Sequence, residues 1–158
     1  MVVVADSSPL RYLIVVGEQE LLPELFGETW IPSAVLIELS ASSTPAGVRT
    51  FLNNPPGWLK VREPREETLE TISAELDRGE RAALALAREL NADLVLLDDA
   101  AARSEAKSLG FRITGTVGVL RLAAERGLIN VPAIVEQLRQ SGFYLNDSLI
   151  HAAFDEWL

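Results

Sequence analysis

The sequence contains no cysteine and a single histidine, His151, among its 158 residues. Without cysteine the chain can form no disulfide, no thiolate nucleophile and no cysteine-ligated zinc site. One histidine cannot build a multi-histidine metal site, and its place in a C-terminal helical pattern indicates a structural role. A metal site in this protein must therefore use oxygen ligands, above all carboxylates.

Long apolar runs are also missing. No segment reaches the length that a membrane span requires, so we expect no membrane contact. The apolar run at the N-terminus follows no basic region and is too short for a signal peptide. These absences predict a cytoplasmic protein.

Basic residues are scarce, with 14 Lys and Arg against 23 Asp and Glu, which gives a formal net charge of −9. A surface that holds a nucleic-acid backbone clusters Lys and Arg, so this balance argues against broad nucleic-acid binding. It favours solubility, a basic partner or a cation site.

Apolar runs alternate with segments at helical spacing. Five strands are predicted, at 2–5, 28–31, 58–62, 94–97 and 111–114. The runs at 2–5 and 94–97 are fully apolar, whereas 58–62 alternates apolar and polar residues and is placed nearer a sheet edge. A helix is predicted over 66–76, and another opens at Glu80 after Asp77-Arg78-Gly79 break the first. This order predicts an α/β fold with a mostly parallel central sheet, in one domain over 1–158. Residues 132–158 are interpreted as an appended helical unit that packs on the core or on a second subunit.

Acidic residues recur where strands end and helices begin. Asp6 follows the first strand directly, and Asp98 and Asp99 follow the fourth. Glu38 points inward if the apolar residues of its helix set the buried face, and Glu80 opens a helix. Ligands of open α/β sheets bind outside the carboxyl ends of the strands, so these acids share one kind of position. Each also has a simpler interpretation, as a helix cap, a partner of the helix dipole or a solvated surface residue.

Carboxylates that lie close together repel one another, and a bound hard divalent cation commonly neutralises this repulsion. Mg²⁺ takes few carboxylates and keeps waters, which leaves room for a substrate phosphate. Two such ions about 3.5–4 Å apart can clamp the attacking and leaving oxygens of a phosphodiester displacement.

Several stretches, in this order and spacing, resemble the PIN-domain nuclease family. They are Asp6-Ser7-Ser8-Pro9-Leu10, the isolated Glu38, Gly79-Glu80-Arg81-Ala82, Leu96-Leu97-Asp98-Asp99 with Arg103, and Gly115-Thr116-Val117-Gly118-Val119-Leu120. The chain from Val2 to about Ile129 is similar to a branch near the VapC toxins, a PIN subfamily of largely unassigned function. The resemblance implies a three-layer α/β/α fold with additional C-terminal helices.

The resemblance also implies metal-dependent hydrolysis of RNA, often by the toxin of a toxin–antitoxin pair, with Mg²⁺ or Mn²⁺ as cofactor. Carried over by position, the catalytic and metal-binding acids are Asp6, Glu38, Glu80 and the pair Asp98 and Asp99. Within that pair Asp99 is preferred, because it opens the following helix, but Asp98 is nearly equal.

Two further residues have supporting roles in this reading. Ser8 would hydrogen-bond and orient Asp6, and Arg103 could meet phosphate, tether a carboxylate or form an ordinary surface salt bridge. The chain departs from the commoner VapC pattern at Glu80, where Asp is usual, and at Leu97, where Thr or Ser is usual. The longer Glu80 side chain leaves the number of metal ions open.

The implied partners are RNA, an antitoxin protein and a second copy of the chain. Apolar helices at 10–14 and 21–26 are candidates for the dimer contact, although core packing explains them equally well. The rival function is a non-catalytic PIN-fold subunit that binds an antitoxin or itself. A response-regulator receiver is disfavoured, because only one acid follows the first strand, and no Gly-rich turn there supports dinucleotide binding.

Overall fold

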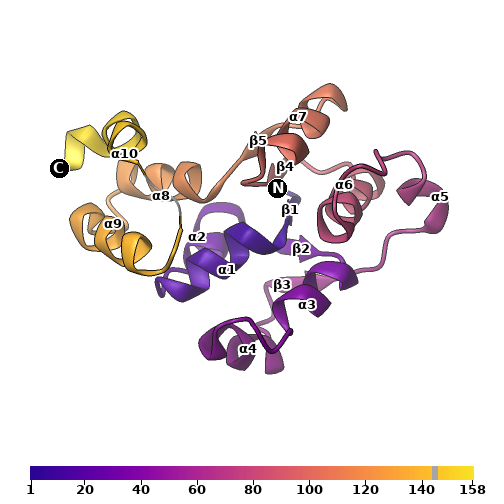
Figure 1. Ribbon diagram of the computed structural model, residues 1–158, viewed down its shortest axis with the longest axis horizontal. Coiled ribbons are helices and arrows are strands. Elements are labelled where there is room, and N and C mark those ends of the chain that lie inside the picture. The colour runs from indigo at the N-terminus through magenta and orange to yellow at the C-terminus, as the bar shows by residue number, and fades with distance from the viewer. Residues whose placement is uncertain (144–145) are drawn as a thin grey trace.

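Five short apolar runs form one sheet in the computed structural model, which describes residues 1–143 and 146–158. All strand pairs are parallel, in the order β3-β2-β1-β4-β5. The strands are β1 (Val3–Ala5), β2 (Thr29–Ile31), β3 (Leu59–Val61), β4 (Leu94–Leu96) and β5 (Ile113–Thr114). Helices lie on both sides of this sheet (Figure 1), so the three-layer α/β/α fold is confirmed.

The helices follow the predicted alternation. They are α1 (Ser7–Val15), α2 (Leu21–Phe26), α3 (Ser33–Leu39), α4 (Ala46–Asn53), α5 (Glu66–Leu69), α6 (Arg78–Leu90), α7 (Ala100–Ser108), α8 (Thr116–Glu125), α9 (Val131–Gln140) and α10 (Asp147–Phe154), followed by a 3-10 turn at Asp155–Trp157. None of the helices that the structure describes has both the length and the apolar character of a membrane span.

The sheet divides the buried side chains into two cores. Val3 and Leu96 face the core under α1 and α8, whereas Val4, Val95 and Leu97 face the core under α6 and α7. Successive residues of a strand point to opposite faces, so a strand with helices on both sides needs apolar residues throughout. This is why β1 is entirely buried.

The C-terminal helices share the first of these cores. Leu138 of α9 and Phe154 of α10 are almost wholly buried, in the same cluster as Leu10 and Leu120. In Figure 1, α9 and α10 lie beside α8 at the end of the molecule opposite α5. Within the described residues, the segment 132–158 therefore packs on the core of the same chain.

The helices proposed for a dimer contact use their apolar faces inside the protein. Leu10, Leu13 and Leu22 have no exposed surface, and Leu21 and Phe26 are buried. Core packing explains these residues, and a dimer stays a prediction without an assigned surface.

The helix predicted over 66–76 is wrong, because α5 ends at Leu69. The Thr71 hydroxyl donates to the carbonyl of Thr68 over 2.6 Å, and Ser73 accepts from the amide of Glu75. Such side-chain bonds to nearby backbone compete with the helical hydrogen bonds and turn the chain out of the helix.

The predicted break at Gly79 is also wrong, since α6 begins at Arg78. Asp77 and Glu80 form a capping box: the Asp77 side chain accepts from the Glu80 amide over 2.8 Å, and Glu80 accepts from the Asp77 amide over 3.2 Å. This reciprocal cap starts the helix two residues earlier and places Gly79 in its first turn.

Candidate active site

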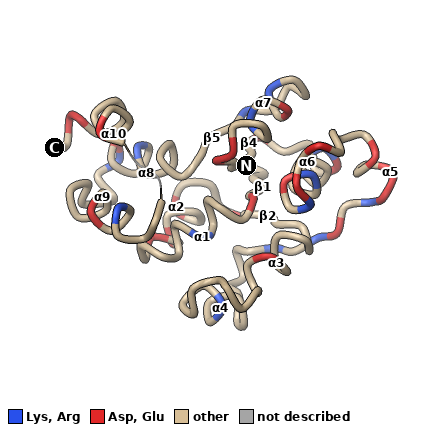
Figure 2. The backbone as a smooth tube through the Cα atoms, in the orientation of Figure 1, with Lys and Arg blue, Asp and Glu red and all other residues tan. Residues whose placement is uncertain are grey.

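The acidic residues collect at the carboxyl ends of β1 and β4. These strands pair in register, with Ala5 opposite Leu96, and the Asp6 amide donates to the Leu96 carbonyl over 3.0 Å. Asp6 and the aspartates after β4 therefore leave the sheet side by side. Figure 2 shows acidic segments of α3 and α6 around the same region next to β1.

Asp6 is the floor of this site. It is 5% exposed, and its Oδ1 atom is buried without a hydrogen-bond partner. Burial raises the pKa of Asp6 to about 7, and the negative charges of Asp77, Glu38 and Glu80 add to the effect, while a backbone hydrogen bond at Ser7 opposes it. A carboxylate in this setting lacks a counter-charge.

Glu38 reaches the site from its rim. Val35 and Leu39 set the buried face of α3 as expected, and Glu38 directs its carboxylate toward the site although the residue as a whole is exposed. A Cβ atom placed on Gly79 would lie 2.9 Å from Glu38 Oε2 and 3.5 Å from Asp6 Oδ1. The two carboxylates thus converge over the bare backbone of Gly79, in a space that any other side chain would fill.

Glu80 connects the capping box to the aspartates after β4. Burial raises the pKa of Glu80 to about 7; the charges of Asp77 and Asp99 and a hydrogen bond with Asp99 act in the same direction, and the backbone bond from Asp77 opposes them. Glu80 and Asp99 therefore lie close enough together for their negative charges to repel. Asp99 also caps α7, accepting from the Ala102 amide over 3.0 Å.

Asp98 is turned to a different set of groups. Its Oδ2 accepts from Ser8 Oγ over 2.8 Å and from Thr116 Oγ1 over 2.6 Å, and its Oδ1 accepts from the Thr116 amide over 2.8 Å. The prediction that Ser8 orients Asp6 is wrong, because the Ser8 hydroxyl donates to Asp98. Asp98 joins β4 to the first turns of α1 and α8.

Arg103 supports the same junction through the backbone. Its Nη1 donates to the Leu97 carbonyl over 2.8 Å. A Cβ atom on Gly115 would lie 2.5 Å from Asp98 Oδ1 and 3.2 Å from Arg103 Nη1, so only glycine fits between them. This explains the glycine before α8. Leu97, where the commoner pattern has Thr or Ser, is a fully buried core residue.

The sequence interpretation missed Asp77 and Thr116. Asp77 is the first of the acids whose charge raises the pKa of Asp6, and it acts on Glu80 as well. The pattern Asp77-x-x-Glu80 is a capping-box signature that could have identified it. Thr116 follows Gly115 at a helix start, but its partner Asp98, which lies after β4, is not evident from the sequence.

The acids form two pairs, Asp6 with Glu38 and Glu80 with Asp99. In the described part of the chain, no three acidic side chains lie close enough together to hold one ion. The groups present nevertheless suit a hard divalent cation, since the donors are all oxygens, a buried oxygen of Asp6 lacks a partner, and Gly79 leaves open the space between two carboxylates. Both oxygens of Asp98 already accept hydrogen bonds, so we assign it a positioning role and Asp99 the role of ligand.

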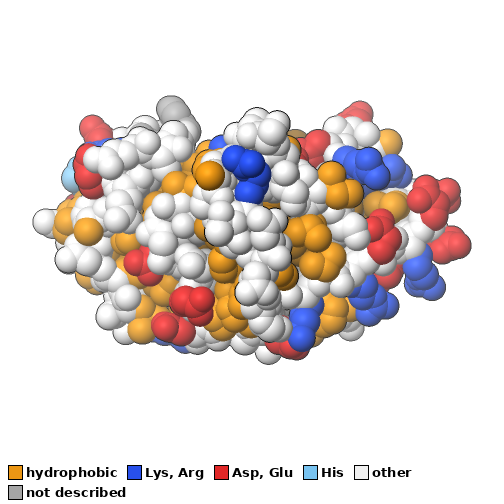
Figure 3. Space-filling model, turned by 90° about the horizontal axis from the view of Figure 1, so that it is seen from below, with side chains coloured by type: hydrophobic (Ala, Val, Ile, Leu, Met, Phe, Trp, Pro, Cys, Tyr) orange, Lys and Arg blue, Asp and Glu red, His pale blue; other side chains and the backbone are white. Residues whose placement is uncertain are grey.

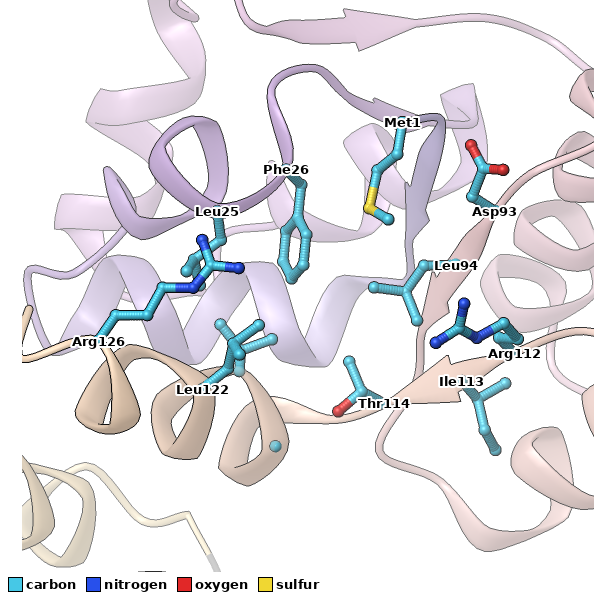
Figure 4. Close-up of a pocket in the computed structure, with 12 residues that line it drawn as sticks. Met1, Leu25, Phe26, Asp93, Leu94, Arg112, Ile113, Thr114, Leu122 and Arg126 are labelled. Atoms are coloured by element: carbon cyan, nitrogen blue, oxygen red, sulfur yellow. The ribbon is translucent and has the colours of Figure 1, made fainter.

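A separate pocket of about 300 Å³ lies at the opposite edge of the sheet (Figure 4). It is lined by residues at the starts of β1, β4 and β5, among them Met1, Asp93 and Arg112, and by Phe26 and Leu122. Its single acid is Asp93, so it lacks the carboxylate pairs of the site at the strand ends.

An all-parallel sheet with helices on both faces and acids at its carboxyl edge defines an α/β protein whose candidate site lies where ligands of such sheets bind. The model of the DUF3368 family, whose description is PIN domain, matches residues 2–157. The chain therefore belongs to the PIN-domain family, whose fold is of the nuclease type.

A solved structure of a PilT N-terminus domain protein, from the hyperthermophilic archaeon Sulfolobus solfataricus P2, is similar to this chain. The TM-score is 0.50 at 18% sequence identity, over 92% of this chain and 98% of that one. At this identity the similarity shows the fold alone. No curated protein matches the chain.

Proposed function

We propose that this protein is a metal-dependent ribonuclease that uses Asp6, Glu38, Glu80 and Asp99 to hold Mg²⁺ or Mn²⁺. The observation that carries the proposal is the position of two acid pairs at the carboxyl edge of the sheet: Glu38 lies near the buried, unpartnered Oδ1 of Asp6, and Glu80 lies near Asp99. Acids at such positions are costly to the fold, and a bound cation would offset that cost.

The proposed ligands differ in burial. Asp6 and Glu80 are buried, with pKa values near 7, so they release protons at neutral pH when a cation competes for their oxygens. Glu38 and Asp99 are exposed and complete the donor set from the solvent side. A divalent ion bound here supplies Lewis-acid activation of a phosphodiester and of water.

Asp98 and Asp77 keep the acids in place. Asp98 fixes the first turn of α1 through Ser8, directly after Asp6, and Asp77 fixes Glu80 through the capping box. Positioning of this kind matters because a ligand that is displaced or free to rotate weakens metal binding.

We also propose that the protein is the toxin of a toxin–antitoxin pair and acts in the cytoplasm, with a homodimer as a further expectation. Support comes from the resemblance of its motifs to the VapC branch and from its net charge of −9, which suits a basic partner. The rival, a non-catalytic subunit, is favoured by the absence, among the described residues, of a three-acid group close enough to hold an ion.

Cleavage of a fluorescent single-stranded RNA with added Mn²⁺ tests the proposal. We expect wild-type protein to cleave, a chelator to stop the reaction, and Asp6→Asn to reduce the rate by about 100-fold or more, because one missing ligand weakens the ion's hold. Glu24→Gln, which removes an exposed charge on α2, is the matched control and should cleave like wild type. Metal-independent cleavage, or equal rates for Asp6→Asn and wild type, would overturn the assignment.

A further inference from the structure

Two hollows lie against the first turns of α1, and each is lined by one of the acids discussed above. The smaller, of about 200 Å³, is lined by Arg11 and Glu38. The larger, of about 690 Å³, is lined by Asp98, Arg103 and Phe143. Ser8 and Tyr12 line both hollows. The two hollows therefore adjoin the same turns of α1, one and two turns after Asp6.

Two aromatic rings meet in the larger hollow. The Tyr12 and Phe143 centroids are 4.7 Å apart with the ring planes at 77°, and both residues are half-buried. Both rings pack against the core on one side and line the hollow on the other, where the part that stays exposed offers a surface for a planar group. Nucleobases are planar groups of this kind, and stacking tolerates any base.

Each hollow also holds one arginine. Arg11 Nε is buried without a hydrogen-bond partner, and its Cζ lies 5.8 Å from the Tyr12 ring centroid. Arg103 uses Nη1 on the Leu97 carbonyl, which leaves further donors. Neither arginine forms a salt bridge with an acid of the described chain, although the sequence has more acids than bases. A guanidinium group that has unused donors and no acidic partner can bind phosphate oxygens.

We propose that these hollows form one path for single-stranded RNA, with bases stacked on Tyr12 and Phe143 and phosphates beside Arg11 and Arg103. The inference deepens the proposed ribonuclease function and rests on it. Stacking on side chains requires bases that are not already stacked in a helix, so the path selects single strands over duplexes. The net charge of −9 argues against a broad basic surface, and on the face shown in Figure 3 the basic side chains form only small, separate groups. In the proposed path, Arg11 and Arg103 take the place of such a surface.

The test is the binding of a short oligouridine labelled at one end, measured by fluorescence anisotropy, with Ca²⁺ present to neutralise the carboxylates. Tyr12→Leu and Phe143→Leu keep apolar volume for packing and remove the ring. Phe51→Leu is the matched control, because Phe51 is a half-buried ring beside Trp58 that lines neither hollow. Circular dichroism and thermal melting verify that each variant folds.

We expect each ring variant to weaken binding of the single strand by about 10-fold, as loss of a stacked base should, with the Phe51→Leu variant unchanged. The matching duplex should bind more weakly than the single strand. Arg103→Gln should weaken binding and flatten its dependence on salt, because one phosphate contact is lost.

Equal affinity in wild type and both ring variants would overturn the path, as would no binding of single strands or equal binding of duplex. The proposed function fails separately. If the protein cleaves RNA with Mn²⁺ but the ring variants bind RNA like wild type, the path is contradicted and the nuclease function stands. If single-strand binding depends on the rings but no cleavage occurs, the nuclease function is contradicted and the path stands.

Discussion

The Ser8 hydroxyl donates to Asp98 Oδ2 across 2.8 Å, and this bond ties the first turn of α1 to the end of β4. Thr116 donates twice to the same carboxylate from the start of α8. One half-buried side chain thus fixes two helices against the sheet edge. Because Asp6 lies two residues before Ser8, the same bond sets the floor of the acidic site.

Asp98 and Asp99 should therefore respond differently to substitution. Asp98→Asn turns one acceptor oxygen into a donor, so either the hydroxyls of Ser8 and Thr116 or the Thr116 amide lose their acceptor. We expect the free energy of unfolding to fall by about 1–3 kcal/mol in urea denaturation. Asp99→Asn keeps an acceptor for the Ala102 amide and relieves repulsion with Glu80. Compared with Asp98→Asn, it should therefore reduce the free energy of unfolding less and the Mn²⁺ affinity more. The reverse pattern would assign the metal to Asp98.

A substitution at Gly79 fills the space between the carboxylates without changing the charge of the site. Gly79→Ala adds a methyl group 2.9 Å from Glu38 Oε2, in the space between two carboxylates. Alanine favours the helix by about 1 kcal/mol over glycine, so the variant should remain folded while Mn²⁺ affinity and cleavage fall by about 10-fold.

Gly47→Ala is the control for that substitution. Gly47 is also the second residue of its helix, and a Cβ atom there meets nothing within 4 Å. The variant gains helix propensity without touching the acids and should cleave like wild type. If both alanine variants have wild-type activity and Mn²⁺ affinity, the space over Gly79 is not part of the site.

Stability without metal should fall as the pH rises from about 4 to 7. The folded pKa values of Asp6 and Glu80 are raised to about 7 from 3.8 and 4.5, so in this range the folded state binds more protons than the unfolded state. Their contribution is complete below the unfolded pKa values and is lost as the pH passes 7. With a chelator present, we expect a Tm several degrees higher at pH 5.5 than at pH 8.

Asp6→Asn removes one of the two titrations and should reduce this difference, whereas Mn²⁺ should raise the Tm at pH 8 more than at pH 5.5, since protons compete with the ion. Differential scanning calorimetry at the two pH values measures both effects. A Tm difference of the same size in wild type and Asp6→Asn would contradict the assigned role of Asp6.

Much of the fold follows from local patterns. The central strand β1 was predictable because a strand covered on both faces needs apolar residues at every position, as at Val3 and Val4, whereas the edge strand β3 shows the expected alternation at Leu59, Lys60 and Val61. The placement of acids directly after β1 and β4 was predictable for the same reason: parallel strands end at one edge. Boundaries set by side-chain bonds to the backbone, as at Thr71 and Asp77, were not.

The periodicity of the sequence could not predict which acid has which role in the site. Asp98 and Asp99 are adjacent acids after the same strand, and only the turn of the chain decides which faces Ser8 and which faces Glu80. Ser8 and Asp98 are 90 residues apart in sequence, and no local pattern relates them. Helix periodicity likewise assigned Val35 and Leu39 correctly but could not show that Glu38 reaches across to Gly79 from an exposed position.

A crystal of the protein soaked in Mn²⁺, with anomalous scattering measured at the manganese edge, tests the central claim most directly. We predict an anomalous peak within coordination distance of Asp6, joined by oxygens of Glu38, Glu80 or Asp99, with Asp98 still bonded to Ser8 and Thr116. No peak at these acids at saturating Mn²⁺, or a peak held by Asp98 without Asp6, would contradict it.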